Sequence, residues 1–76
     1  MDAKGAKVLE LEAVDARIRA GERLVAEQEL RIARFPTLGI DESPSMKLLQ
    51  QFNLSLDLLT RTRSIILREF QGILPS

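Results

Sequence analysis

The chain has 76 residues, no cysteine and no histidine, and its 11 lysines and arginines are balanced by 11 aspartates and glutamates. This composition excludes disulfides and thiolate sites, and it removes the commonest metal ligand and the commonest general base. We therefore expect no cofactor, no metal, no small-molecule substrate and no enzymatic activity. A single domain of this size gains only about 3–5 kcal/mol from its own core, so self-association or a partner protein is the expected additional source of stability.

Neither a membrane-spanning segment nor a signal peptide is visible in the sequence. Its apolar runs are far shorter than the ~20 residues that span a bilayer. The opening MDAKGAKVLELEAVDARIRA lacks the continuous apolar stretch of a signal peptide. The sequence predicts a cytoplasmic protein that does not use a membrane.

Residues from about 6 to 35 predict a long amphipathic helix. The segment is rich in Ala, Leu, Glu, Arg and Gln, which are strong helix formers. Its apolar residues recur at steps of three and four, which form one stripe at about 100° per residue. The stripe contains Leu11, Val14, Ile18, Gly21, Val25, Ile32 and Phe35, with Leu24 at its edge. Gln28 occupies the one polar position in this series.

Residues 36–43 predict the bend between two helices. Pro36 disfavours the α conformation for Phe35, so the first helix is expected to end there, or to kink and fray soon after. Glycine suits the left-handed conformation that closes a helix, Asp or Ser can cap the next one, and Pro is favoured in its first turn. The residues with these roles are Gly39, Asp41 or Ser43, and Pro44. Such closely spaced caps are typical of a tight helix–helix connection, which is favoured over a catalytic or binding loop.

Residues from about 44 to 71 predict a second amphipathic helix with a wider apolar surface. The same three-four spacing places Leu49, Phe52, Leu56, Leu59, Ile66, Phe70 and Ile73 on one face, widened by Leu48 and Leu67. Arg63 interrupts this face, and Gly72 and Pro75 supply stop signals. A second ridge, formed by Leu54, Leu58 and Ile65, lies roughly on the opposite side, which is unusual for a helix that buries one face.

Together the segments predict a single all-α domain, a long antiparallel two-helix hairpin. Its turn places Gly21 level with Leu56 and Leu59, where glycine would allow the backbones to approach. Arg63 comes level with Asp15, and two outcomes stay open there: a weak ion pair, or a side chain that extends along its apolar stem to water.

A lone hairpin cannot cover both apolar sides of the second helix, and monomers rarely tolerate so large an exposed strip. We therefore expect a homodimer in which two hairpins form a four-helix bundle around a two-fold axis. The predicted hairpin and dimer core is Leu11, Val14, Ile18, Gly21, Val25, Ile32, Leu49, Phe52, Leu56, Leu59, Ile66 and Phe70. The ridge of Leu54, Leu58 and Ile65 would then serve a tetramer, another protein or only a crystal contact. The direction in which the hairpins pack stays open.

Three stretches carry a resemblance to a known group of proteins: AGERLVAEQELRIAR, GIDESPSMKLLQQF and SLDLLTRTRSIILREF. Their shared elements fall at Gly21, Glu22, Arg23, Val25, Ala26, Gln28, Gly39, Asp41, Leu48, Leu49, Phe52, Ser55, Leu56, Arg61, Arg63 and Arg68. This pattern, over roughly the last three-quarters of the chain, resembles a group of small uncharacterised alpha-proteobacterial helical-hairpin proteins. Pro36 departs from it, because the group carries a helix-favouring polar residue there. The resemblance implies the hairpin and a bacterial cytoplasmic setting, and it implies no chemistry.

Three functional classes are disfavoured by the residues themselves. A carboxylate metal site could be suggested by Glu10, Glu12 and Asp15, but Glu10 and Glu12 do not share a helix face. A nucleotide site is disfavoured because the sequence has no Gly-rich phosphate loop.

A basic strip for nucleic acid could be built from Arg17, Arg19, Arg23, Arg31, Arg34, Arg61 and Arg68. Interleaved glutamates and the lack of stacking aromatics outside the core argue against nucleic-acid binding.

Binding to a membrane surface is disfavoured as well. The second helix has an apolar face as broad as that of a membrane-surface helix, but it lacks the lysine-rich polar face of such helices.

The remaining prediction is a non-catalytic protein–protein interaction or structural module. One form is a structural homodimer that is complete in itself. The other is a small regulatory adaptor that binds a partner helix in its apolar groove. The sequence leaves both open, although the first predicts an obligate dimer and the second an exchangeable one.

Overall fold

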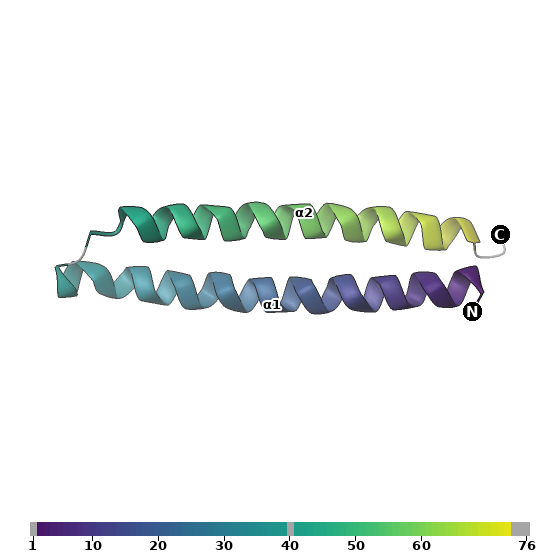
Figure 1. Cartoon of the computed structure of the whole chain (residues 1–76), viewed down its shortest axis with the longest axis horizontal. Coiled ribbons are helices and arrows are strands. Elements are labelled where there is room, and N and C mark those ends of the chain that lie inside the picture. The colour runs from purple at the N-terminus through teal and green to yellow at the C-terminus, as the bar shows by residue number, and fades with distance from the viewer. Residues whose placement is uncertain (1, 40, 74–76) are drawn as a thin grey trace.

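The computed structural model describes residues 2–39 and 41–73, without the side chains of residues 36–38. Over these residues the chain forms two helices and no strand: α1 spans Ala3–Leu38 and α2 spans Ser43–Ile73. The helices lie antiparallel, with α1 extending past the start of α2 at the bend, and α1 begins and α2 ends at the same end of the molecule (Figure 1). The predicted all-α helical hairpin is confirmed.

The hairpin is a rod. Its extents are 59 × 17 × 15 Å, and its radius of gyration is 17.5 Å. A compact domain of this length has a radius of gyration of about 11 Å. With one helix facing one helix, none of the described side chains is fully buried.

The accessible surface is correspondingly large. It measures 5844 Å², whereas a folded monomer of 8.5 kDa exposes roughly 4,650 Å². The hairpin therefore exposes roughly 1,200 Å² more than an ordinary monomer of its mass.

Few side chains of the hairpin are buried. Among the described residues only Val14, Gln28 and Phe35 are buried, and all three belong to α1. The other members of the predicted core are half-buried: Leu11, Ile18, Gly21, Val25, Ile32, Leu49, Phe52, Leu56, Leu59, Ile66 and Phe70. This intermediate burial is what one covering helix provides, because a single neighbour covers only part of an apolar stripe.

Helix α1 begins at Ala3, earlier than the predicted start near residue 6. Asp2 caps it: one carboxylate oxygen accepts the Gly5 N–H at 2.7 Å, and the Asp2 carbonyl accepts the Ala6 N–H at 3.0 Å. An acidic cap satisfies otherwise unpaired amide groups and favours the positive end of the helix dipole. The cap thus holds Gly5 within the helix despite its low helix propensity.

Helix α1 also runs past Phe35 to Leu38, beyond the predicted end. Proline removes its own N–H but leaves the donors of the residues after it, so a helix can continue for part of a turn beyond Pro36. Gly39 then takes a positive φ of 69°, the left-handed conformation that ends a helix at low cost only for glycine.

Helix α2 begins at Ser43 and ends at Ile73, slightly longer at both ends than predicted. The Asp41 carboxylate accepts the Ser43 N–H at 3.0 Å, and the first helical bond joins the Met46 N–H to the Glu42 carbonyl at 2.9 Å. Hydrogen bonds from the Ser43 backbone and side chain lower the pKa of Asp41. The Asp41 carboxylate is therefore the cap of α2, and the Ser43 N–H is the group that it caps. Pro44 lies in the first turn.

Candidate interaction surface

The helices meet closely at mid-length, where Gly21 faces Leu56. A Cβ atom at Gly21 would lie 2.7 Å from Leu56 Cδ2 and 3.3 Å from its Cγ, closer than side chains ordinarily approach. The absence of a side chain on Gly21 therefore makes room for Leu56. This is the close approach that the sequence suggested for Gly21.

Beside this contact lies a shallow groove of about 350 Å³, which we call the mid-rod groove. It is lined from α1 by Arg17, Ala20, Gly21 and Leu24, and from α2 by Phe52, Ser55, Leu56 and Leu59. Leu24 stands at its rim with 47% of its surface exposed. The groove is open and almost entirely apolar, so it suits an apolar side chain from another helix.

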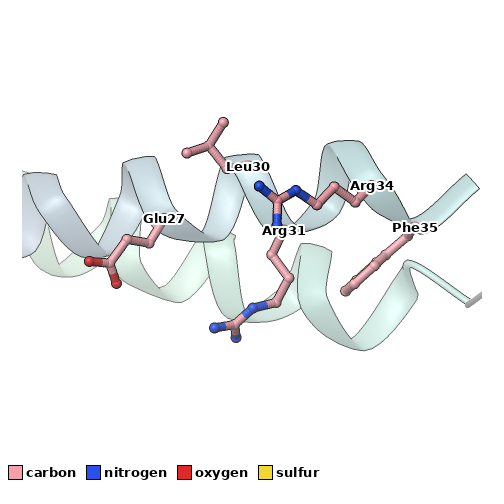
Figure 2. A pocket seen from close by; sticks show the side chains of 5 residues that line it. All are labelled: Glu27, Leu30, Arg31, Arg34 and Phe35. Carbon is pink, nitrogen blue, oxygen red and sulfur yellow. The ribbon is translucent and has the colours of Figure 1, made fainter. Parts of the chain in front are cut away.

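A second hollow of about 370 Å³ lies near the bend and is lined from α1 alone by Glu27, Leu30, Arg31, Arg34 and Phe35. Figure 2 shows Phe35 and Arg31 directed toward α2, and Leu30 directed away from it. Phe35 is one of the two apolar residues that are buried in the described part of the chain. The hollow thus combines two arginines with apolar side chains at one end of the rod.

Gln28 is buried, and both polar atoms of its side chain have a hydrogen-bond partner, although it occupies the polar position of an apolar stripe. Its side-chain amide donates to the Ser45 carbonyl at 3.1 Å, and its oxygen accepts from Arg31 Nη1 at 3.4 Å. Only 3% of Gln28 is exposed, so water cannot replace these partners well. Gln28 therefore ties α1 to the first turn of α2 and helps to position Arg31.

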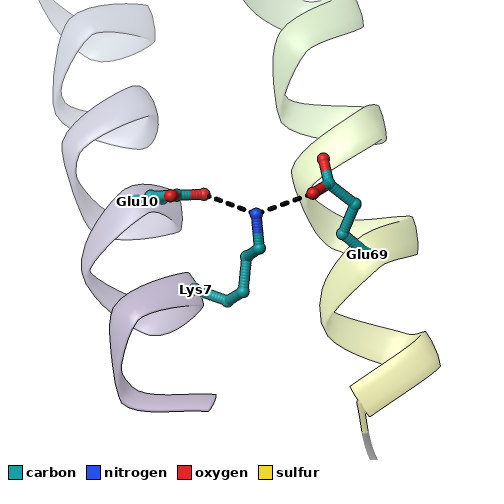
Figure 3. Close-up of polar contacts among 3 residues, drawn as sticks. All are labelled: Lys7, Glu10 and Glu69. Carbon is teal, nitrogen blue, oxygen red and sulfur yellow. Dashed lines mark hydrogen bonds and ion pairs between the residues drawn. The ribbon is translucent and has the colours of Figure 1, made fainter. Parts of the chain in front are cut away.

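Lys7 joins the two helices at the opposite end of the rod. Its ammonium donates to Glu69 of α2 at 2.7 Å and to Glu10 of α1 at 3.1 Å (Figure 3). These hydrogen bonds, with that to Glu69 contributing most, raise the pKa of Lys7. The carboxylates of Glu10 and Glu69 are each about half exposed and can also contact a partner.

Arg63 forms the ion pair that was one of its two expected outcomes. Its Nε atom lies 2.6 Å from Asp15 Oδ1. The two side chains remain 42% and 35% exposed, so the pair is worth no more than about 0.2–1 kcal/mol. It links the helices without filling the core.

The ridge of Leu54, Leu58 and Ile65 is uncovered. Their exposed fractions are 62%, 66% and 55%. α1 lies on the other side of α2, as the helical spacing predicted. The ridge is thus an apolar surface separate from the face that forms the hairpin.

The described residues contain no group of three or more His, Cys, Asp or Glu side chains placed to hold a metal ion. Of the acidic residues considered from the sequence, Glu10 pairs with Lys7 and Asp15 with Arg63. Neither α1 nor α2, over the residues that the structure describes, has a stretch both long and apolar enough to cross a bilayer.

Several contacts were missed by sequence reasoning. The Lys7–Glu69 pair joins residues at opposite ends of the chain, and only the register of the folded hairpin brings them together. Gln28 was recognised as a polar interruption, but its partner Ser45 was not. Asp2 did carry a signal, since an aspartate before a helix-forming run is a common cap.

Comparison of the chain with models of protein families, with curated proteins and with solved structures finds no match. The resemblance to alpha-proteobacterial hairpin proteins stays a prediction that rests on its motifs. A function has to be argued from the surface of the hairpin itself.

Proposed function

We propose that this protein is a non-catalytic interaction module that self-associates, with two hairpins packing side by side into a four-helix bundle. The observation that carries the proposal is the half-covered apolar face. Within the described part of α2 no residue is buried, although its inner face is lined by leucine, isoleucine and phenylalanine. Elements with an apolar face are stable when a further layer covers it.

The size of the exposed surface supports the same proposal. The excess over an ordinary monomer, roughly 1,200 Å², exceeds the ~800 Å² that each partner buries in a standard protein–protein interface. A second hairpin would remove surface of this order from both copies. The apolar part of this burial would add to the few kcal/mol that a small core contributes.

The test is sedimentation equilibrium over a wide concentration range, with helicity followed by circular dichroism on the same samples. The proposal predicts a dimer that loses helicity on dilution, because the lone hairpin lacks a covered core. A helical monomer that persists at the highest concentration would contradict it.

A second candidate function is favoured by the exposed ridge of Leu54, Leu58 and Ile65. These residues lie at the spacing with which one helix docks against another, which suits an adaptor that receives the apolar face of a partner helix. Subunit exchange between two differently labelled samples discriminates the two functions. A structural dimer exchanges slowly, whereas an adaptor that releases its apolar face exchanges within the mixing time. The bacterial cytoplasm is the setting we propose for either function, on the resemblance alone.

A further inference from the structure

We propose that the second copy docks on the mid-rod groove with the two rods antiparallel, about a two-fold axis that crosses them between Ala20 and Gly21. In this arrangement α1 lies against α1 of the second copy and α2 against its α2. The inference rests on the proposed self-association and adds to it the face, the direction and the register.

The first argument is the position of the groove along the rod. Gly21 lies midway between Ala3 and Leu38, and Leu56 and Leu59 flank the middle of α2. A two-fold axis at mid-length places each groove over the other and overlaps the rods along their whole length. An axis elsewhere would leave one end of each hairpin uncovered and would forfeit part of the available surface.

The second argument is the shape of the α1 face that lines the groove. Residues seven apart lie on the same face of a helix with a drift of about 20°. Steps of seven from the groove residue Ala20 lead back to Ala13 and Ala6. In the other direction they lead to Glu27 and Arg34. Steps of seven from Arg17 and Leu24 lead to Glu10 and Arg31. Alanine on this face lets two helices approach closely, and the exposed Leu24 can then enter the groove of the second copy.

The third argument is charge. In the antiparallel register Glu10 of one copy lies level with Arg31 of the other, each about 16 Å from the axis at 1.5 Å per residue. The Glu10 side chain is 48% exposed, and Arg31 is also exposed, so both can reach a partner. If α1 lay against α1 in the parallel direction, Glu10 would face Glu10 and Arg31 would face Arg31. Opposite charges therefore favour the antiparallel register.

Engineered cysteines test the direction directly, because the chain has no cysteine of its own. The full-length Ala20→Cys variant is expected to form a disulfide-linked dimer on mild oxidation, since its two cysteines lie beside the axis. The matched Ala13→Cys variant, on the same face but about 22 Å along the rod from its symmetry mate, should stay unlinked. The Leu54→Cys variant, on the back of α2, should stay unlinked as well.

Any other pattern of crosslinking contradicts the proposed antiparallel packing of α1 on α1. If sedimentation shows a dimer but Ala20→Cys does not crosslink, the rods do not pack α1 on α1 about this axis. Equal crosslinking of Ala13→Cys indicates a parallel pair of α1 helices, and preferential crosslinking of Leu54→Cys moves the interface to the ridge. None of these three results contradicts the proposed self-association. A wild-type chain that is monomeric by sedimentation overturns the proposed function instead.

Affinity measurements test the groove and the charges separately. Leu24→Gln is expected to raise the dimer dissociation constant at least tenfold, because each copy loses a buried leucine, while Leu54→Gln leaves it unchanged. Glu10→Arg and Arg31→Glu should each weaken the dimer by roughly threefold or more. A 1:1 mixture of these two variants should recover wild-type affinity, because both ion pairs re-form in the mixed dimer. A mixture no tighter than either variant would overturn the register.

Discussion

The two helices differ in how much of their apolar surface the other covers. α1 buries Val14, Gln28 and Phe35, whereas the described part of α2 has no buried residue. Each helix has one neighbour, so neither apolar surface is covered completely. On α1 most of the apolar side chains follow one stripe, and on α2 they also form the ridge of Leu54, Leu58 and Ile65. The lesson is that α2 holds apolar surface which a hairpin alone cannot use.

The largest effect on this comparison is expected from truncating an aromatic side chain on each helix. Phe35→Ala should lower the free energy of unfolding by about 3 kcal/mol or more, because it empties the buried contact near the bend. Phe70→Ala, the corresponding change at a half-buried residue of α2, should lower the free energy of unfolding by a smaller amount. Urea denaturation followed by circular dichroism measures both. A loss below about 1 kcal/mol for Phe35→Ala would contradict the burial described for α1.

The close approach at mid-length is tested by giving Gly21 a side chain. Gly21→Leu should destabilise the hairpin by about 1–3 kcal/mol, because even a Cβ atom would press on Leu56. Gly72→Leu is the matched control: no atom lies within 4 Å of a Cβ there, so better helix propensity should leave stability unchanged or raise it by up to about 1 kcal/mol. If thermal unfolding showed the same change for both variants, the helices would not meet at Gly21.

The buried side chain of Gln28 should contribute more to the stability of the hairpin than the side chain of an exposed glutamine. Gln28→Ala removes a buried side chain together with its hydrogen bond to the Ser45 carbonyl, and we expect a loss of about 1–3 kcal/mol. The same substitution at the exposed Gln50 should change stability by no more than about 0.5 kcal/mol. Chemical denaturation of the two variants gives the comparison. Similar values would mean that Gln28 is solvated.

The smallest expected effect is that of the α2 cap. The pKa of Asp41 is lower in the folded chain than its ordinary value because the carboxylate accepts hydrogen bonds from Ser43. Its contribution is therefore present above the unfolded pKa of about 3.9 and is lost as the pH falls through the folded pKa. In Asp41→Asn the amide oxygen still caps but does not titrate. Below pH 4 the difference in melting temperature between the native chain and this variant should shift in favour of the variant, and a constant difference would contradict the role of Asp41.

The fold was predictable from the sequence because its signals are local. Three-four spacing of apolar residues gave both helices, and Gly39 and Asp41 gave the bend, since each acts through its own backbone or that of a near neighbour. The candidate site was predictable only in part. The contact of Gly21 with Leu56 followed from the turn, but the Lys7–Glu69 pair depends on the exact register between two helices. Register follows from the sum of many side-chain contacts, which no single motif encodes.

The central claim is that the hairpin is half of a side-by-side bundle. Small-angle X-ray scattering with an absolute mass tests it most directly. The account predicts a particle of twice the 8.5 kDa chain mass whose longest dimension stays near the 59 Å of one rod, because the second copy overlaps the first along its length. A particle of one chain mass, or a dimer about twice as long as the rod, would contradict the claim.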